Sequence, residues 1–199
     1  MKNSEEGQYE GDGFPRRGSP ARGIVLAADG SIAASPIAAE EAAFFGGWSP
    51  VSRPTGRDAR ESSRLARRIK ARPKQCWFNA RRAVLRLGDY AEAGYVEGLA
   101  VTREGLVIEH GWVVRGERIV DPTLPGSVAA YFAGLEFPGR AGIAGFLATP
   151  LGHGLERSPF FHAFGFAGCE SSSFARAWAD AQAYLHELVR GRRSRRSTS

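Results

Sequence analysis

The sequence lacks the features that place a chain in a membrane or outside the cell. It has no uninterrupted run of about 18 apolar residues, so it predicts no membrane-spanning helix. The N-terminal segment MKNSEEGQYEGDGF is polar and acidic, without the apolar stretch of a signal peptide. Only two cysteines are present, Cys76 and Cys169, and without a secretion signal we expect both to be reduced thiols. These absences favour a cytoplasmic protein.

Metal-binding and repeat signatures are also missing. No Asp-x-Asp-x-Asp-Gly loop of the calcium-binding type occurs. His153, His162 and Cys169 follow one another at spacings of nine and seven residues, which match no compact zinc pattern. No internal repeat or heptad run is visible. We therefore expect neither a metal ion nor a cofactor.

The length and composition predict one domain with tails. A chain of 199 residues with 43% hydrophobic content can bury one core. We predict a disordered tail over 1–22, rich in Gly, Glu, Arg and Ser, a single domain over 23–190, and a basic tail over 191–199. Near the start of the domain, Gly23–Ala28 is typical of a hairpin edge and Ala38–Phe45 of a short helix.

Positive charge is concentrated in one part of the chain. Residues 53–86 contain twelve basic and two acidic side chains, whereas 87–189 contain six basic and twelve acidic ones. Basic runs can bind nucleic acid through phosphates. No aromatic residue lies among the arginines of 53–74, however, and a base-stacking platform needs them. A solvated, Arg-rich helix over 57–72 is therefore the favoured interpretation.

The residues that can carry chemistry lie between 74 and 123. Cys76 opens an amphipathic helix that Gly88 ends, since apolar residues recur from Cys76 at spacings of four, seven, eight and eleven. A strand over Leu106–Val114 carries His110, and a second strand beginning at Ile119 leads to Asp121. A two-residue turn at Arg115-Gly116 would place His110 directly opposite Asp121.

Those three residue types together predict nucleophilic catalysis. A cysteine in the first turn of a helix faces the positive end of the helix dipole, which stabilises a thiolate. An aspartate that accepts from one nitrogen of a histidine fixes the tautomer, and leaves the other nitrogen to take the thiol proton. Each residue alone has a structural explanation: a buried cysteine, a hydrogen-bonded strand histidine, and an Asp-Pro turn. Their joint occurrence favours a Cys76–His110–Asp121 triad.

Four short motifs in this stretch resemble those of the transglutaminase-like superfamily. They are QCW at 75–77, YVEG at 95–98, HGWV at 110–113 and VDPT at 120–123. The resemblance implies an α+β fold with a papain-like core, in which a helix opened by the catalytic cysteine packs on an antiparallel sheet. It implies Cys76 as nucleophile, His110 as general base and acid, and Asp121 as the orienting residue. Lys74 and Gly111 depart from the motifs, which have glycine and alanine there.

The function that follows is a cysteine-dependent acyl-transfer enzyme that forms a thioester. Its substrate would be a protein, a peptide or a small amide, with hydrolysis favoured over transfer because no amine-binding site is apparent. The alternative is a non-catalytic binding module of the same fold, which contacts nucleic acid or an acidic partner through 53–86. The sequence identifies neither the substrate nor the oligomeric state.

Residues near the triad are candidates for lining its cleft. Gln75 directly precedes the nucleophile, so the backbone N–H of Cys76 is a better oxyanion donor than the Gln75 side chain. Trp77 follows the cysteine. Asn79 can either support the first helical turn or reach the cleft. Trp112 shares a strand face with His110 and can shield the imidazole.

The remaining segments predict packing elements. Ser127–Phe137 fits either a short helix or a strand beside the cleft, with Tyr131 and Phe132 as core or pocket residues. The Gly- and Phe-rich run 138–169 is long for a loop and is expected to be a lid or capping element. Ser171–Arg190 predicts a closing helix, because Phe174, Trp178, Ala181, Leu185 and Leu188 recur at steps of three and four.

Overall fold

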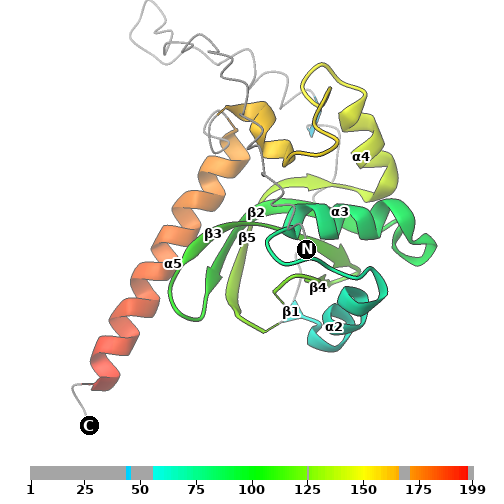
Figure 1. Ribbon diagram of the computed structural model, residues 1–199. Helices are drawn as coiled ribbons and strands as arrows, with labels where there is room; N and C mark the ends of the chain where they lie inside the picture. The colour runs from blue at the N-terminus through cyan, green and yellow to red at the C-terminus, as the bar shows by residue number, and fades with distance from the viewer. Residues whose placement is uncertain (1–43, 46–55, 125, 166–170, 197–199) are drawn as a thin grey trace, which may run out of the picture. The chain divides into compact units, whose positions relative to one another are not determined.

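A mixed, five-stranded sheet with helices packed on it defines the fold (Figure 1). The structure is a computed structural model and describes residues 44–45, 56–124, 126–165 and 171–196. The predicted α+β class is confirmed. The strand order is β1-β4-β3-β2-β5, with antiparallel pairing except where β1 runs parallel to β4. The strands are β1 (Gly56–Arg57), β2 (Gly94–Thr102), β3 (Val107–Arg115), β4 (Arg118–Val120) and β5 (Val128–Phe137).

Helix α2 (Ala59–Arg68) has a well-formed cap at each end. Its N-cap is Asp58, whose carboxylate accepts a hydrogen bond from the Glu61 amide at 2.8 Å. At its C-terminus the Lys70 amide bonds to the Arg67 carbonyl, and the next amide reaches back to the Ala66 carbonyl. This pair of bonds is a Schellman motif, and it places Lys70 in the left-handed region with φ +50°.

Helix α3 (Cys76–Arg86) begins at the predicted cysteine and lies across β2 and β3. Ala80, Ala83 and Val84 are fully buried, because their three- and four-residue spacing puts them on the face that meets the sheet. A short 3₁₀ turn, η1 (Gly88–Tyr90), follows the helix and leads into β2. The predicted start and stop of this helix are confirmed.

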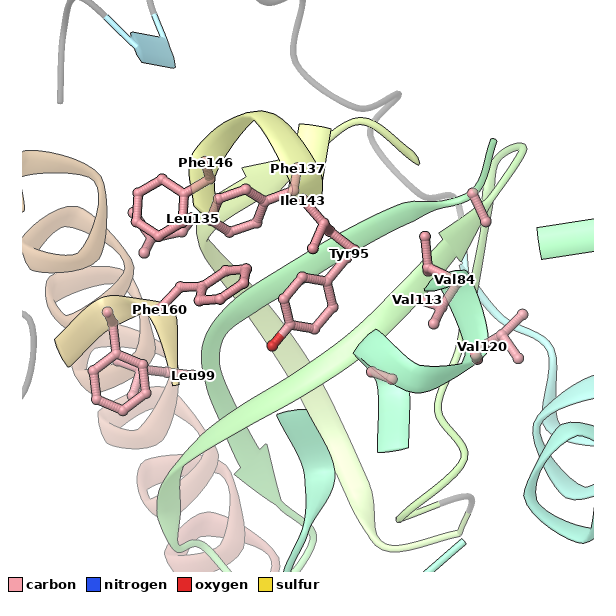
Figure 2. Close-up of a cluster of buried hydrophobic side chains, with 14 of the residues drawn as sticks. Val84, Tyr95, Leu99, Val113, Val120, Leu135, Phe137, Ile143, Phe146 and Phe160 are labelled. Carbon is pink, nitrogen blue, oxygen red and sulfur yellow. The ribbon is translucent and has the colours of Figure 1, made fainter. Parts of the chain in front are cut away.

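The sheet has a buried cluster on each face. The larger one lies under the helices and is rich in aromatic rings; Figure 2 shows Tyr95, Phe137, Phe146 and Phe160 converging there. The smaller one lies on the opposite face and consists of Val96, Trp112, Val114 and Ile119, with Tyr131 packed against it. All nine residues of strand β2, which lies between β3 and β5, are buried.

The Gly- and Phe-rich run, predicted to be a lid or a capping element, contributes side chains to the main core. It contains helix α4 (Gly139–Leu147) and the 3₁₀ helix η2 (Phe160–Phe164). Phe146, Phe160 and Phe164 are fully buried in the larger cluster. The described part of this segment is therefore held down by its aromatic side chains. The segment 127–137, for which the sequence predicts either a helix or a strand, forms strand β5 from Val128 onward.

Helix α5 (Ser172–Arg196) continues beyond its predicted end at Arg190. It packs on β5 and β2 through Phe174, Ala177 and Ala181. Trp178, predicted to lie on the buried face, is 50% exposed. One residue corresponds to a rotation of about 100° around a helix, so the narrow stripe 174–177–181 leaves Trp178 beside it.

Several predictions fall on residues that the structure does not describe. These are the tail over 1–22, the hairpin edge at 23–28, Cys169, and all of the proposed helix 38–45 except Phe44 and Phe45, which are helical. The described elements belong to a unit that spans 34–199. Among the helices that the structure describes, none has the length and apolar character required to cross a membrane.

Candidate active site

The β3–β4 hairpin turns one residue later than the sequence predicted. The turn residues are Gly116 and Glu117, and Arg115 pairs with Arg118. Gly116 takes φ +57°, the positive angle that the first position of a two-residue hairpin turn requires, which an arginine there would adopt only under strain. The predicted turn at Arg115-Gly116, and with it the direct pairing of His110 with Asp121, is wrong.

His110 and Asp121 nevertheless meet, because the register moves by two residues. A shift of two keeps every side chain on its predicted face of the sheet. Val114 pairs with Ile119, so Asp121, just beyond β4, lies diagonal to His110 and within side-chain reach. The His110 Nε2 atom lies 2.8 Å from Asp121 Oδ2.

Asp121 is fully buried, and each of its carboxylate oxygens accepts two hydrogen bonds. Oδ1 accepts from the amides of Thr123 and Leu124, both at 2.9 Å. Oδ2 accepts from His110 and from the hydroxyl of Tyr131 at 2.9 Å. An ionised carboxylate only accepts, so Nε2 of His110 must carry a proton, and Nδ1 is left to face the Cys76 sulfur.

Tyr131 is the functional neighbour that sequence reasoning placed only as a core or pocket residue. It comes from β5, whose position beside β2 depends on long-range strand pairing that the sequence did not predict. Its ring packs against Trp112 with centroids 5.2 Å apart. Burial and the nearby Asp121 carboxylate raise the pKa of Tyr131 well above its usual value, so the phenol stays protonated and donates.

Cys76 is partly exposed at the first turn of α3, beside the buried imidazole. Its sulfur lies 4.0 Å from the carbonyl oxygen of Glu109, and its interaction with His110 contributes to the raised pKa of that histidine. The first amide of α3 that bonds back to the chain is that of Asn79, to the Gln75 carbonyl at 2.8 Å. The amides of the three residues before Asn79 have no acceptor within the helix.

The imidazole of His110 is held in its charged form. Burial disfavours the charge, but hydrogen bonds to Asp121 and Cys76 and the negative charges of both partners raise the pKa of His110 to about 9. For Asp121, burial again opposes ionisation, and the hydrogen bond and charge of His110 outweigh it and lower the pKa of the carboxyl. At neutral pH His110 is therefore an imidazolium.

The close approach of α3 to β3 explains why glycine occupies position 111. A Cβ atom there would lie 2.6 Å from the Cα atom of Trp77 and 2.9 Å from its amide nitrogen. The first turn of the helix therefore rests directly on the backbone of β3, next to His110. The departure from the alanine of the family motif has a steric reason in this chain.

Asn79 supports the first turn of α3 and has no part in lining a cleft. It is fully buried, and its side chain makes two hydrogen bonds with the backbone of Arg72. The Arg72 amide donates to Asn79 Oδ1 at 3.1 Å, and Asn79 Nδ2 donates to the Arg72 carbonyl at 2.7 Å. Nδ2 also donates to Thr123 Oγ1 at 3.0 Å. One side chain thus joins the loop before Cys76 to the loop after Asp121.

The other predicted cleft residues take different positions. Gln75 is the N-cap residue of α3, and its side chain makes no capping hydrogen bond. Trp77 is half-buried against the main core. Trp112 is 2% exposed, and its ring lies roughly parallel to that of His110 with centroids 6.2 Å apart. Trp112 therefore packs beside the imidazole, and its shielding role stays a prediction.

No family model, curated protein or solved structure matches this chain.

A second buried polar cluster lies under α3 and contains the acid Glu97. The carboxylate of Glu97 accepts from the hydroxyl of Tyr95 and from the amides of Phe160 and Phe161 at 2.9 and 3.0 Å. Burial raises the pKa of Glu97. Arg81, only 3% exposed, donates to carbonyls at 155 and 158, at 3.0 and 2.7 Å. The cluster fixes the segment 155–161 over the sheet.

The arrangement can perform proton transfer and nucleophilic attack. It contains a partly exposed thiol in the first turn of a helix and a buried histidine that is bonded to a carboxylate. Within the described ranges, no group of three His, Cys, Asp or Glu side chains is placed to hold a metal ion. The exposed His153 and His162 lie outside this arrangement.

Proposed function

We propose that the protein is a cysteine-dependent amide hydrolase or acyltransferase with a transglutaminase-like, papain-like core. The observation that supports this most strongly is the position of the His110 ring, which is bonded to Asp121 through Nε2 and interacts electrostatically with Cys76. The order of the three residues along the chain and the four short motifs around them agree with that superfamily.

The reaction begins with attack of the Cys76 thiolate on a substrate carbonyl carbon. The new carbon–sulfur bond places negative charge on the carbonyl oxygen, and the first amides of α3 are positioned to stabilise it. His110 then gives its Nδ1 proton to the leaving amine as the carbon–nitrogen bond breaks, which leaves a thioester. Asp121 and Tyr131 keep the ring oriented throughout.

Water releases the acyl group in the second half of the reaction. His110, now neutral, removes a proton from the attacking water. The carbon–sulfur bond then breaks and Cys76 leaves as a thiolate, which restores the thiolate–imidazolium pair. The products are a carboxylic acid and the free enzyme. An amine in place of water would give a new amide by the same steps.

A direct test is the reactivity of the thiol. In a Cys169→Ser background, Cys76 should react with iodoacetamide at pH 6 at least tenfold faster than glutathione, because a nucleophilic sulfur beside a histidine is activated for attack. His110→Asn should reduce that rate to the glutathione level. Rates are measured by mass spectrometry of the intact chain. Equal rates for Cys76 and glutathione would refute the proposal.

The reaction itself is tested with a panel of peptides that contain glutamine, asparagine and C-terminal amides. We expect release of ammonia or of an amine with the wild-type chain and none with Cys76→Ala. A thioester adduct trapped at Cys76 would identify the intermediate. Turnover that persists in Cys76→Ala would show that another group carries the reaction.

A further inference from the structure

A cationic pocket lies beside the candidate site and has no role in the chemistry described so far. Its volume is about 450 Å³. Alanines and prolines supply its apolar lining, and Arg67, Lys70 and Arg72 supply its charge. The complete lining consists of Ala66, Arg67, Lys70, Ala71, Arg72, Pro73, Pro122 and Thr123.

The positive charges of the cationic pocket are not neutralised by nearby acids. Arg67, Lys70 and Arg72 are exposed, and none of them forms a salt bridge with an acidic side chain among the described residues. Burial lowers the pKa of the adjacent Arg82 guanidinium, and repulsion from Arg86 and Arg72 lowers it further. An anion entering the pocket would relieve this repulsion.

Lys70 occupies a backbone position that suits glycine better. It is the C′ residue of the Schellman motif that ends α2, with φ +50°. Residues with a Cβ adopt this conformation at a cost, and glycine is the usual choice there. The backbone conformation of this loop therefore does not explain why position 70 is a lysine. A ligand that binds its ammonium group would explain it.

The cationic pocket shares its walls with the candidate site. Thr123 lines the pocket, and its amide donates to Asp121 Oδ1. Pro73 lies three residues before Cys76, which limits the separation of their Cα atoms to about 11 Å. An extended peptide of about three residues covers that distance.

We propose that the cationic pocket binds a carboxylate of the acyl substrate, two or three residues from the amide that Cys76 attacks. This inference rests on the proposed function, in which Cys76 attacks an amide of the substrate. The ammonium of Lys70 and the guanidinium groups of Arg67 and Arg72 bind the carboxylate. The Thr123 hydroxyl, which accepts from Asn79, has its own proton left to donate.

Binding to the full-length Cys76→Ala protein tests the proposal without turnover. The probes are acetylated, amidated pentapeptides with glutamine at the centre and one glutamate at each other position in turn. Isothermal titration calorimetry should find one glutamate position that binds about tenfold more tightly than its glutamine counterpart. That preference should fall when NaCl is raised from about 50 to 500 mM, because exposed charges are screened.

Matched variants separate the pocket from general charge effects. Lys70→Gly and Arg72→Ala should each reduce the glutamate preference about five- to tenfold, and Lys70→Gly should raise the thermal midpoint because it relieves the left-handed lysine. Arg60→Ala removes an exposed charge of helix α2 that does not line the pocket. Lys74→Gly removes a second left-handed lysine, φ +59°, that does not line it. Both controls should keep the preference.

Two further probes identify the source of the carboxylate. A peptide with a free C-terminus and no glutamate tests a terminal carboxylate, and a phosphoserine peptide tests whether any anion is accepted. A 12-nucleotide RNA that binds through Lys70 and Arg72, together with peptides that show no glutamate preference, would overturn the proposal in favour of a nucleic-acid surface.

The outcomes also separate this inference from the proposed function. Glutamate-dependent binding to Cys76→Ala, combined with an inert thiol in the wild-type chain, would refute the enzyme and retain the cationic pocket. Amide hydrolysis with equal rates for glutamate and glutamine peptides would refute the pocket and retain the enzyme.

Discussion

At the scale of single residues, the site depends on one carboxylate whose acceptor capacity is fully used. Asp121 accepts four hydrogen bonds, and two of them, from His110 and Tyr131, arrive at the same oxygen. The two backbone amides on the other oxygen fix the orientation of the carboxylate. The His110 ring is therefore held by a group that cannot rotate away.

The titration of His110 should reveal this environment. Its pKa of about 9 in the folded chain lies above the ordinary value of about 6.5. Protonated His110 thus stabilises the fold fully below pH 6.5, and on the order of 3 kcal/mol is lost as the pH rises through 9. NMR of the His110 ring against pH measures the shift, with the exposed His153 as an internal reference.

The same titration in Cys76→Ala should give a lower pKa for His110, because one of the two hydrogen-bonding partners that raise it is gone. Asp121→Asn should lower it further, since it removes the larger partner. A His110 pKa that does not change in either variant would contradict the described contacts.

Tyr131→Phe removes one donor to Asp121 and leaves the ring packing on Trp112 intact. We expect a loss of about 1 kcal/mol of folding stability, and a several-fold slower alkylation of Cys76 because the histidine is less firmly oriented. Chemical denaturation and iodoacetamide kinetics measure the two effects. Phe132→Leu, on the neighbouring position of β5, is the control for altered packing and should leave the alkylation rate unchanged.

At the scale of elements, the close contact of α3 with β3 decides whether sulfur and imidazole meet. The helix rests on the backbone of Gly111 without an intervening side chain. Because Cys76 comes directly before Trp77, any increase in the separation at this contact moves the sulfur away from His110.

Gly111→Ala should therefore be damaging although alanine is small. The added Cβ would overlap the backbone of Trp77, so the helix must shift, at a cost of about 1–3 kcal/mol. Cys76 alkylation should fall with it. Gly145→Ala in α4 is the matched control, since a Cβ there meets nothing within 4 Å. Its stability should be unchanged or slightly higher, as expected for alanine in a helix. Equal effects of the two substitutions would contradict the described packing.

The sequence predicts these elements well where the signal is local. The helix from Cys76 follows from apolar periodicity and a glycine stop, and β3 follows from its β-branched residues. The turn predicted between β3 and β4 is displaced by one residue, because the prediction puts Gly116 at the second turn position. The positive φ of Gly116 is needed at the first position. The contribution of Tyr131 depends on the pairing of β5 with β2, which no local pattern encodes. The role of Asn79 is equally hard to predict from the sequence, since both of its partners belong to loops.

At the scale of the whole molecule, a few buried polar side chains connect parts of the chain that are far apart in sequence. Arg81 on α3 reaches carbonyls at 155 and 158, and its guanidinium lies 4.2 Å from the centre of the Phe160 ring. The same helix carries Cys76 at its first residue. The core around η2 and the candidate site are thus connected through α3.

Arg81→Met should destabilise the chain by about 3–5 kcal/mol, because it leaves the carbonyls at 155 and 158 without the donor that now bonds to both. Arg86→Met, an exposed position of the same helix, should cost less than about 0.5 kcal/mol. Urea denaturation followed by circular dichroism measures both. A small loss for Arg81→Met would mean that water can replace the guanidinium.

The hydrogen bonds of Asn79 to the amide and the carbonyl of Arg72 limit where this chain can change in length. A single carboxamide holds both the amide and the carbonyl of a residue seven positions earlier in the chain, so the spacing between Arg72 and Asn79 admits neither insertion nor deletion. Adding one glycine after Pro73 would break this spacing without altering any reactive group. Distant homologues that retain the thiol should therefore vary freely in their outer loops and keep the segment from Arg72 to Cys76 at constant length.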